Sequence, residues 1–180
     1  LNFLAGEALD RPGIMRLAAS LGSDVPFFLV GGTALGEGRG ERVTPLVQAP
    51  PLPLVLASPG MPLLAADVYR RFDDMGGGEP PMGGAEIMGE ALRSGDARRV
   101  AALLFNSLQP AACSLLPQTG ALLERALWAG APGALVSGSG PTVFMLALDE
   151  GRAEELEAEM RKHAPVVVRA RFRPAGVSPV

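Results

Sequence analysis

Glycine and proline interrupt this chain so often that short elements joined by tight turns are expected throughout. The 180 residues include 23 glycines and 17 prolines, about 22% of the chain against a usual share of roughly 12%. Proline removes a backbone donor and glycine admits conformations closed to other residues, so both tend to end helices and strands. Because 48% of the residues are hydrophobic, the chain can bury a core. We expect one or two compact domains.

Charge and residue usage exclude several classes of function. Sixteen basic and 19 acidic residues give a formal net charge of −3, so no overall positive field attracts nucleic acid or an anionic membrane. One cysteine, Cys113, and one histidine, His163, exclude an intramolecular disulfide and the usual zinc sites, and we predict no metal ligands. No apolar run approaches the ~20 residues that span a bilayer, and no signal-peptide pattern is present. A cytoplasmic protein without nucleic-acid or membrane partners is expected.

The first 50 residues are expected to hold helices and a hairpin. Residues 1–9 are typical of the end of a helix, as if the chain were entered part-way through one. Asp10 is a good N-cap for a helix that has Pro12 in its first turn and stops at Gly22. The pattern then predicts an apolar run at 27–30 and two short strands at 33–37 and 41–46.

The prolines after Ala49 mark the predicted domain border, because Pro50 and Pro51 can neither continue a helix nor donate to a strand ladder. We expect one domain over residues 1–50 and a second over 51–180. For the second, the hydrophobic spacing predicts the following elements in order: a strand at 52–57, a helix at 64–74, a surface loop at 75–84, two or three helices within 85–129, strands at 134–136 and 143–146, a helix at 150–163 and a strand at 166–170. This order predicts an α+β fold with helices on one face of a sheet.

Asp24 is the first candidate catalytic residue. It follows Gly22 and Ser23 and precedes Pro26 and two phenylalanines, so it lies at a backbone corner with apolar neighbours, where a carboxylate can be oriented as a general base. The alternative is that Asp24 only caps the short helix that starts at Pro26.

The segment Ser137-Gly138-Ser139-Gly140-Pro141-Thr142 is the second candidate, between two predicted strands. Its glycines allow close backbone approach, and its N–H and hydroxyl groups suit a phosphate or another anion. No lysine follows the glycines, so it is not a Walker loop. A tight turn required by strand geometry is the alternative.

Tyr69, the only tyrosine, is the third candidate, one helical turn before Phe72. Its ring could stack on a base, whereas a single aromatic at helical spacing can equally be core packing.

Three motifs together resemble the GHMP kinase superfamily and, within it, the family of 4-diphosphocytidyl-2-C-methyl-D-erythritol kinases. They are Leu21-Gly22-Ser23-Asp24-Val25-Pro26-Phe27-Phe28-Leu29, then Gly31-Gly32-Thr33-Ala34 with Gly36-Glu37-Gly38-Arg39-Gly40-Glu41, and Ser137-Gly138-Ser139-Gly140-Pro141-Thr142-Val143-Phe144. Their order and spacing over most of the chain carry the resemblance.

The resemblance implies ATP- and Mg²⁺-dependent phosphorylation of the 2-hydroxyl of 4-diphosphocytidyl-2-C-methyl-D-erythritol, a small-molecule substrate of the non-mevalonate isoprenoid pathway. It implies a catalytic role for Asp24, a nucleotide-binding active-site loop containing Gly138, Ser139 and Gly140, and stacking of Tyr69 on cytosine. The implied fold is the two-domain GHMP fold, with part of a ribosomal-protein-like N-terminal domain and a complete ferredoxin-like C-terminal domain.

The chain also departs from the family. Asn106-Ser107-Leu108 stands where relatives often carry Asn-Asp-Leu. The family's N-terminal lysine strand and ATP phosphate loop have no counterpart, so an N-terminally truncated kinase is expected, inactive as it stands. Two alternatives remain open: another small-molecule GHMP kinase, and a non-catalytic metabolite-binding or regulatory module. The oligomeric state, a homodimer included, is also left open.

Overall fold

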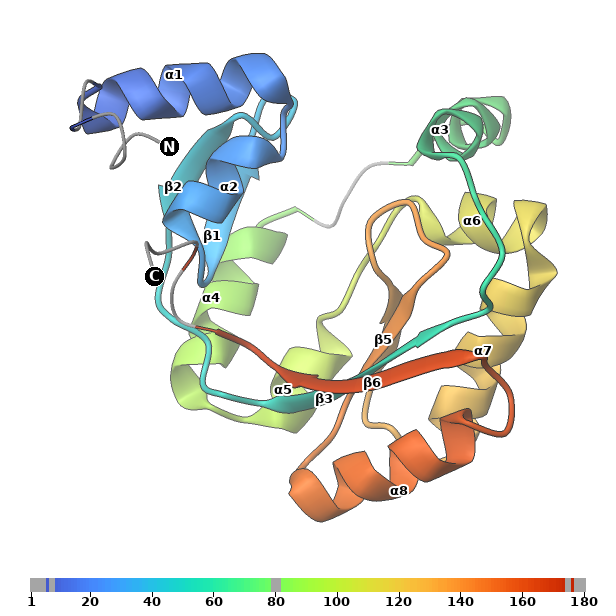
Figure 1. Cartoon of the computed structure of the whole chain (residues 1–180). Coiled ribbons are helices and arrows are strands. Elements are labelled where there is room, and N and C mark those ends of the chain that lie inside the picture. The colour runs from blue at the N-terminus through green and yellow to red at the C-terminus, as the bar shows by residue number, and fades with distance from the viewer. Residues whose placement is uncertain (1–5, 7–8, 79–81, 174–175, 177–180) are drawn as a thin grey trace. The chain divides into compact units, whose positions relative to one another are not determined.

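The computed structural model describes residues 6, 9–78, 82–173 and 176 of the chain (Figure 1). The chain divides into two compact units, Leu1–Pro51 with Arg173–Val180, and Leu52–Phe172. The predicted border after residue 50 differs from this division by one residue. The predicted second domain ran to residue 180, whereas Arg173–Val180 group with the first unit. The helix end predicted for residues 1–9 lies largely outside the described residues.

The first unit contains two helices and a hairpin: α1 (Arg11–Leu21), α2 (Val25–Val30), β1 (Ala34–Glu37) and β2 (Arg42–Pro45). The predicted N-cap is confirmed, because Oδ1 of Asp10 accepts a hydrogen bond of 2.8 Å from the N–H of Gly13. Gly22 follows the last helical residue and its N–H donates to the carbonyl of Ala18. Strands β1 and β2 pair antiparallel, as predicted.

The second unit is built on a four-stranded sheet. Its strands are β3 (Pro53–Ser58), β4 (Ala134–Val136), β5 (Val143–Leu146) and β6 (Val166–Arg171), in the spatial order β4-β5-β3-β6. Every neighbouring pair is antiparallel. Since helices connect β3 to β4 and β5 to β6, this order is the split βαβ arrangement of ferredoxin-like folds, and the fold expected for this part of the chain is confirmed.

Six helices are described in the second unit: α3 (Ala65–Asp74), α4 (Gly84–Ser94), α5 (Ala97–Ala102), α6 (Gln109–Leu115), α7 (Pro117–Trp128) and α8 (Glu150–Met160). Four of them fall within residues 84–128, so the prediction of two or three was too low. Pro110 and Pro117 each stand in the first turn of a helix, where a missing N–H costs nothing. The last helix ends three residues before His163, the predicted end.

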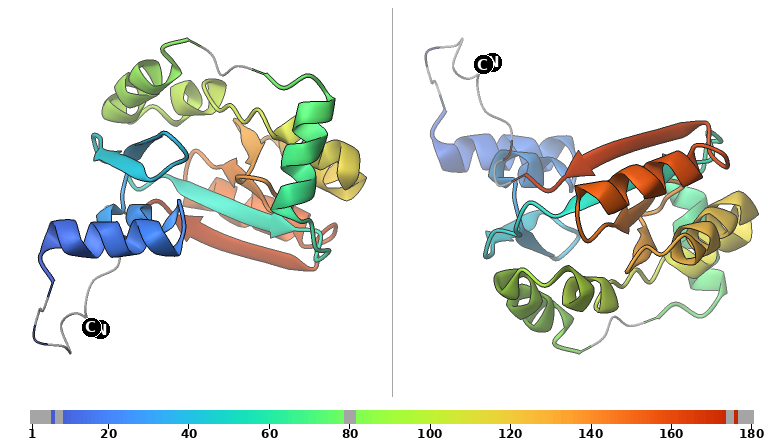
Figure 2. Two further views of the ribbon diagram at one scale, coloured as in Figure 1. Left: turned by 90° about the horizontal axis from the view of Figure 1, so that it is seen from above. Right: turned by 90° about the horizontal axis from the view of Figure 1, so that it is seen from below.

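The main hydrophobic cluster of the second unit lies on one face of this sheet. Ala57 of β3 stands opposite Val143 of β5 and Val167 of β6, and Val143 stands opposite Val136 of β4. These side chains are buried in one cluster with Leu122 and Leu123 of α7 and with Leu156 and Met160 of α8. Figure 2 shows α8 lying along the strands that it covers. Helices α7 and α8 therefore cover this face of the sheet, as the predicted α+β arrangement requires.

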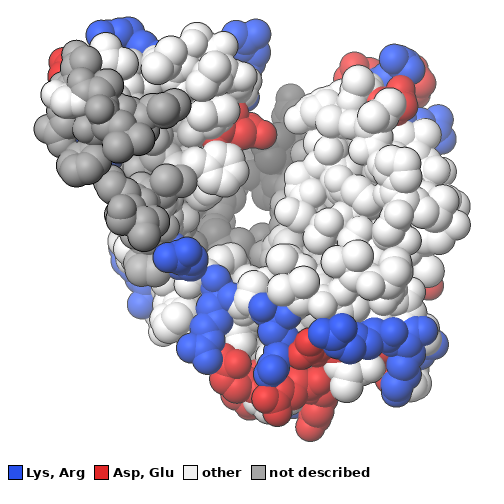
Figure 3. Space-filling model, viewed as in Figure 1, with Lys and Arg blue, Asp and Glu red and all other residues white. Residues whose placement is uncertain are grey.

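Charged side chains join α8 to the neighbouring strand β6 at the surface. Arg169 pairs with Glu154 at 2.8 Å and with Glu157 at 2.6 Å, and Arg171 pairs with Glu150 at 2.9 Å. Figure 3 shows these acidic and basic groups gathered over α8 and β6.

Among the described residues, no helix is both long and apolar enough to cross a membrane.

Candidate active site

Asp24 stands at the start of α2 without capping it. Its backbone has φ −84° and ψ −14°, and its side chain makes no capping hydrogen bond to the helix. The residue is exposed, whereas Pro26, two positions later, is buried. Asp10 shows the contrast, because its carboxylate is used to cap α1. The alternative that Asp24 serves as a helix cap is therefore not supported.

The turn of the β1–β2 hairpin approaches Asp24 closely. Gly40 has φ +103°, and a Cβ atom added to it would lie 3.6 Å from Oδ1 of Asp24 and 3.9 Å from the carbonyl oxygen of Ser23. A glycine is suited to this position because the left-handed backbone penalises a side chain, and an added Cβ would lie in van der Waals contact with the Asp24 carboxylate. The structure thus brings together the first two sequence motifs, which are separated by most of α2 and β1.

The predicted glycine-rich loop connects β4 to β5 and is held by its own backbone. The N–H of Ser137 donates to the carbonyl of Thr142 at 2.8 Å, and the N–H of Gly140 donates to the carbonyl of Ser137 at 2.9 Å. Gly140 has φ +84°, and a Cβ there would lie 3.0 Å from Cγ1 of Val136. The loop is therefore closed at its base and tightly packed at Gly140, and its N–H groups at Gly138 and Ser139 are not used in these bonds.

Two polar side chains that the motif analysis did not single out as site residues support this loop. Nδ2 of Asn106 donates to the carbonyls of Val136 at 2.8 Å and Gly138 at 2.7 Å. Oε1 of Gln109 accepts from the N–H of Val136 at 3.0 Å. These residues precede their partners by about thirty positions, so local spacing carries no signal for the contact. The signal in the sequence was the segment Asn106-Ser107-Leu108, which resembles the family's Asn-Asp-Leu, although no role followed from it.

Tyr69 lies on the outer face of α3 with 56% of its surface exposed, while the adjacent Val68 is buried. Core packing therefore does not explain this tyrosine, and its ring is accessible for stacking. One turn later, Phe72 lines a cavity of about 230 Å³ together with Phe105, Asn106 and Ser107. Leu63, just before α3, lies next to Gly140, whose added Cβ would be 3.6 Å from its Cδ2. The segment leading into α3 and the glycine-rich loop are thus neighbours.

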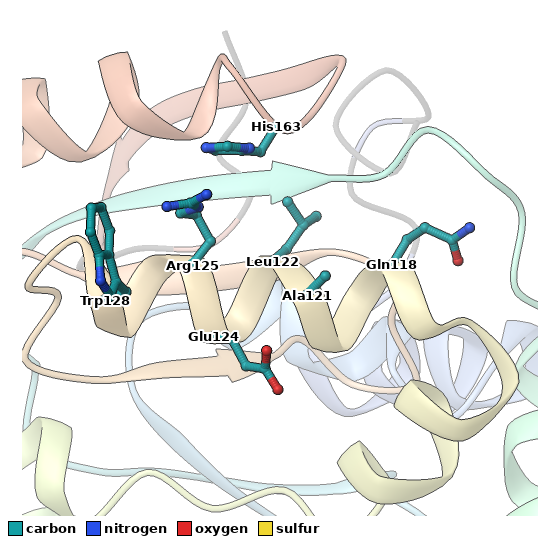
Figure 4. A pocket seen from close by; sticks show the side chains of 7 residues that line it. All are labelled: Gln118, Ala121, Leu122, Glu124, Arg125, Trp128 and His163. Carbon is teal, nitrogen blue, oxygen red and sulfur yellow. The ribbon is translucent and has the colours of Figure 1, made fainter.

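A larger cavity, of about 570 Å³, lies on α7 and contains none of the predicted site residues (Figure 4). The guanidinium of Arg125 stacks over Trp128 at 4.9 Å. Arg125 and His163 both approach Oε1 of Glu159, at 3.8 and 3.1 Å. The neighbouring lysine, Lys162, and His163 lower the pKa of Glu159 through their hydrogen bonds. Glu159 pairs with both Arg125 and Lys162, so the cluster joins α7 to the end of α8.

Cys113 is half-buried and packs against the core of the second unit. Burial raises the pKa of its thiol, and the charge of Glu124 adds to this effect. A thiol with a raised pKa is a poor nucleophile at neutral pH. Cys113 therefore packs as a small, half-buried hydrophobic side chain.

Comparison with known proteins shows which sequences and folds this chain resembles. Residues 88–166 match the family model described as "GHMP kinases C terminal". The chain is 42% identical over 175 residues to 4-diphosphocytidyl-2-C-methyl-D-erythritol kinase of Pelotomaculum thermopropionicum. This match covers 97% of this chain and 60% of that protein. It is 42% identical over 149 residues to the same enzyme of Deinococcus radiodurans, covering 83% of this chain and 48% of that protein. The chain thus spans about half to three fifths of these relatives.

Solved structures show the same fold. A crystal structure of 4-(cytidine 5'-diphospho)-2C-methyl-D-erythritol kinase superposes with a TM-score of 0.78 at 32% identity, over 96% of this chain and 60% of that one. A homoserine kinase from Cytophaga hutchinsonii superposes with a TM-score of 0.77 over 97% of this chain and 62% of that one, at 20% identity, which supports the fold alone. The domain match over residues 88–166, the kinase sequences similar along nearly all of the chain, and the shared fold show that the chain carries a GHMP kinase C-terminal domain and resembles 4-diphosphocytidyl-2-C-methyl-D-erythritol kinases.

Proposed function

We propose that this chain is the part of a 4-diphosphocytidyl-2-C-methyl-D-erythritol kinase that supplies its catalytic base and a phosphate-binding loop. The observation that carries the proposal is the Asp24 carboxylate, which is exposed at the start of α2 and not consumed as a helix cap. The kinases that share 42% identity with the chain give the substrate class. Unit 1 would then be the end of the N-terminal domain of such a kinase, and unit 2 its C-terminal domain.

The proposed reaction transfers the γ-phosphoryl group of ATP to the 2-hydroxyl of the substrate. Asp24 accepts the hydroxyl proton while the new O–P bond forms and the bond to ADP breaks. A carboxylate suits this task because the hydroxyl becomes acidic only as the phosphoryl group arrives, so a weak base placed within hydrogen-bonding distance suffices. The glycine at position 40 keeps side-chain atoms away from Oδ1 of Asp24, which leaves room for a hydroxyl.

The remaining predicted residues receive binding roles in this proposal. The N–H groups of Gly138 and Ser139, which make no hydrogen bond within the described part of the chain, are suited to phosphate oxygens. Tyr69 presents an exposed ring to the cytosine. Mg²⁺ would enter bound to the nucleotide, because this ion keeps water and phosphate oxygens as ligands, and we assign no residue of the chain to it.

The direct test is ATP-dependent phosphorylation of 4-diphosphocytidyl-2-C-methyl-D-erythritol by the protein expressed from its complete reading frame, beside the 180-residue chain. Replacing the base in Asp24→Asn should lower kcat about 10²- to 10⁴-fold, the usual contribution of a general base, with little change in the KM for ATP. Asp74→Asn is the matched control, since Asp74 is exposed at the end of α3. A nearly unchanged rate in Asp24→Asn would remove Asp24 from the mechanism.

The same assay separates the alternatives. Phosphorylation of homoserine or mevalonate in place of the cytidine substrate would identify a different GHMP kinase. Binding of the substrate without turnover, even by the longest form of the protein, would favour a metabolite-binding module.

A further inference from the structure

Asn106 lies in the short segment between α5 and α6, and every hydrogen-bonding group of its amide is used. Nδ2 donates to the carbonyls of Val136 and Gly138, at 2.8 and 2.7 Å. Oδ1 accepts from the N–H of Leu108 at 2.9 Å. We infer that Asn106 is a positioning residue that fixes the direction of the Ser139 N–H in the loop between β4 and β5.

The inference follows from the planarity of the peptide group. The carbonyl of Gly138 and the N–H of Ser139 belong to one trans peptide, so they point in opposite directions. Because Asn106 holds this carbonyl toward itself, it turns the N–H of Ser139 away from the segment between α5 and α6. No acceptor within the described part of the chain engages that N–H. The contact with Asn106 thus leaves the N–H of Ser139 as an unused donor on the outer side of the loop.

The contact at Val136 places a second peptide in the same way. Its carbonyl accepts from Asn106, and the N–H of Ser137 in the same peptide donates to Thr142 across the base of the loop. Gln109 holds the other side of Val136 by accepting from its N–H at 3.0 Å. Asn106 therefore sets the peptides Val136–Ser137 and Gly138–Ser139, one on each side of the Ser137–Gly138 pair at the start of the loop.

An asparagine is the residue that this position requires. Two carbonyls and one N–H face the amide, which matches two donors on nitrogen and one acceptor on oxygen. An aspartate keeps the acceptor toward Leu108 but turns a negative oxygen toward two carbonyl oxygens. A leucine or an alanine leaves two carbonyls without a donor. Since Gly138 has φ +57° and open space around its Cα, little besides Asn106 restrains its peptide.

The use of this donor rests on the proposed function. A loop N–H held outward without a partner suits the oxygens of a phosphate group, the ligand of a phosphoryl-transfer enzyme. Asn106 touches neither reacting atom, so its effect on the reaction acts through Ser139.

The test begins with hydrogen exchange of the unliganded 180-residue chain, which needs no activity. In Asn106→Ala, the N–H groups of Ser137 and Gly140, whose bonds close the loop, should exchange at least about tenfold faster while amides of α8 do not change. In Asn106→Asp, the loss of protection at these two amides should be largest at pH 7. It should be partly reversed near pH 4, because a protonated carboxyl can donate to one carbonyl. Asn106→Ala should show no such reversal. Ser114→Ala on α6 is the control, because it loses the hydrogen bond that its hydroxyl donates to Ala111 and the one that it accepts from Arg71 of α3.

Kinetics of the protein from its complete reading frame form the second arm. Asn106→Ala and Asn106→Asp should raise the KM for ATP about tenfold or more, while Ser114→Ala should not. Unchanged protection at Ser137 and Gly140 overturns the positioning role, whatever the activity. Lost protection with unchanged kinetics overturns the link to phosphate binding. If the wild-type protein transfers no phosphoryl group, the proposed function fails, and the exchange arm still decides whether Asn106 positions the loop.

Discussion

Tyr69 is proposed to act through its ring alone, since its side chain is exposed on α3. Removing the ring in Tyr69→Ala should raise the KM for the cytidine substrate about 5- to 150-fold, because base stacking on an aromatic side chain contributes roughly 1–3 kcal/mol. The value of kcat should change little, since the cytosine does not react. Tyr69→Phe keeps the stacking surface and should leave KM within about twofold of the wild-type value. Steady-state kinetics at saturating ATP provide the measurement, and an unchanged KM in Tyr69→Ala removes Tyr69 from the substrate site.

Gly133, just before β4, is a residue whose missing side chain has a structural cause. A Cβ added there would lie 2.8 Å from Cβ, 3.0 Å from the carbonyl oxygen and 3.1 Å from Cα of Ala101. The neighbour is largely backbone, which cannot move aside without shifting α5. Gly133→Ala should therefore lower the free energy of unfolding by about 1–3 kcal/mol, the usual cost of overpacking. Denaturant unfolding monitored by circular dichroism gives the value.

Gly89, inside α4, is the matched control, because a Cβ there meets nothing within 4 Å. In a helix interior alanine is favoured over glycine, so Gly89→Ala should raise the free energy of unfolding by about 0.5–1 kcal/mol. If the close approach at Gly133 is the cause, the two substitutions must change the free energy of unfolding in opposite directions. A loss of stability in both would show that the close approach at Gly133 is not the cause.

At the scale of elements, the contact between α8 and β6 depends on Glu157. Its side chain is only 17% exposed and lies between Arg161 and Arg169, each at 2.6 Å. The hydrogen bond from Arg161, followed by the charge of Arg169, lowers the pKa of Glu157. A carboxyl with a lowered pKa in the folded state stabilises the fold above its unfolded pKa of about 4.5. This contribution is lost as the pH falls through the lower folded value.

Glu157→Gln should therefore be less stable than the wild type at pH 7, and the difference should shrink as the pH is lowered from 5 toward 3. Thermal unfolding across this pH range measures the effect. Glu154→Gln is the comparison, since Glu154 also pairs with Arg169 but is 65% exposed, and solvent weakens such pairs. A gap between wild type and Glu157→Gln that stays constant with pH would contradict the assigned cause.

The elements themselves were largely predictable, because their signals are local. Asp10 accepts from a backbone N–H group at the start of α1, as its N-cap position predicted, and Asp96 caps α5 in the same way. The order of the strands in the sheet was not predictable from spacing, since it depends on pairings such as that of Ala57 with Val167, far apart in the chain. The glycine-rich loop has a local sequence signal and was predicted. The contact by which Asn106 holds it joins residues far apart in the chain, so it became visible only in the fold.

For the molecule as a whole, the two units differ in how much core each contains. The hydrophobic cluster that runs from Val55 to Val167 lies entirely within the second unit. In the first unit several large apolar side chains are exposed, among them Leu21 and Phe28. Since burial of apolar surface is the main favourable term in folding, most of the stability of the chain should reside in the second unit.

We therefore expect a fragment of residues 52–172 to fold cooperatively and to unfold within about 5 °C of the whole chain, since a domain with its own core can fold alone. Trp128, the only tryptophan, lies in this unit, so its fluorescence reports the same transition in both proteins. Leu156→Ala, which empties a fully buried position, should cost about 2–5 kcal/mol, and the cost should be the same in fragment and whole chain. A much larger loss in the fragment would show that the first unit supports this core, because independent parts of a protein contribute additively.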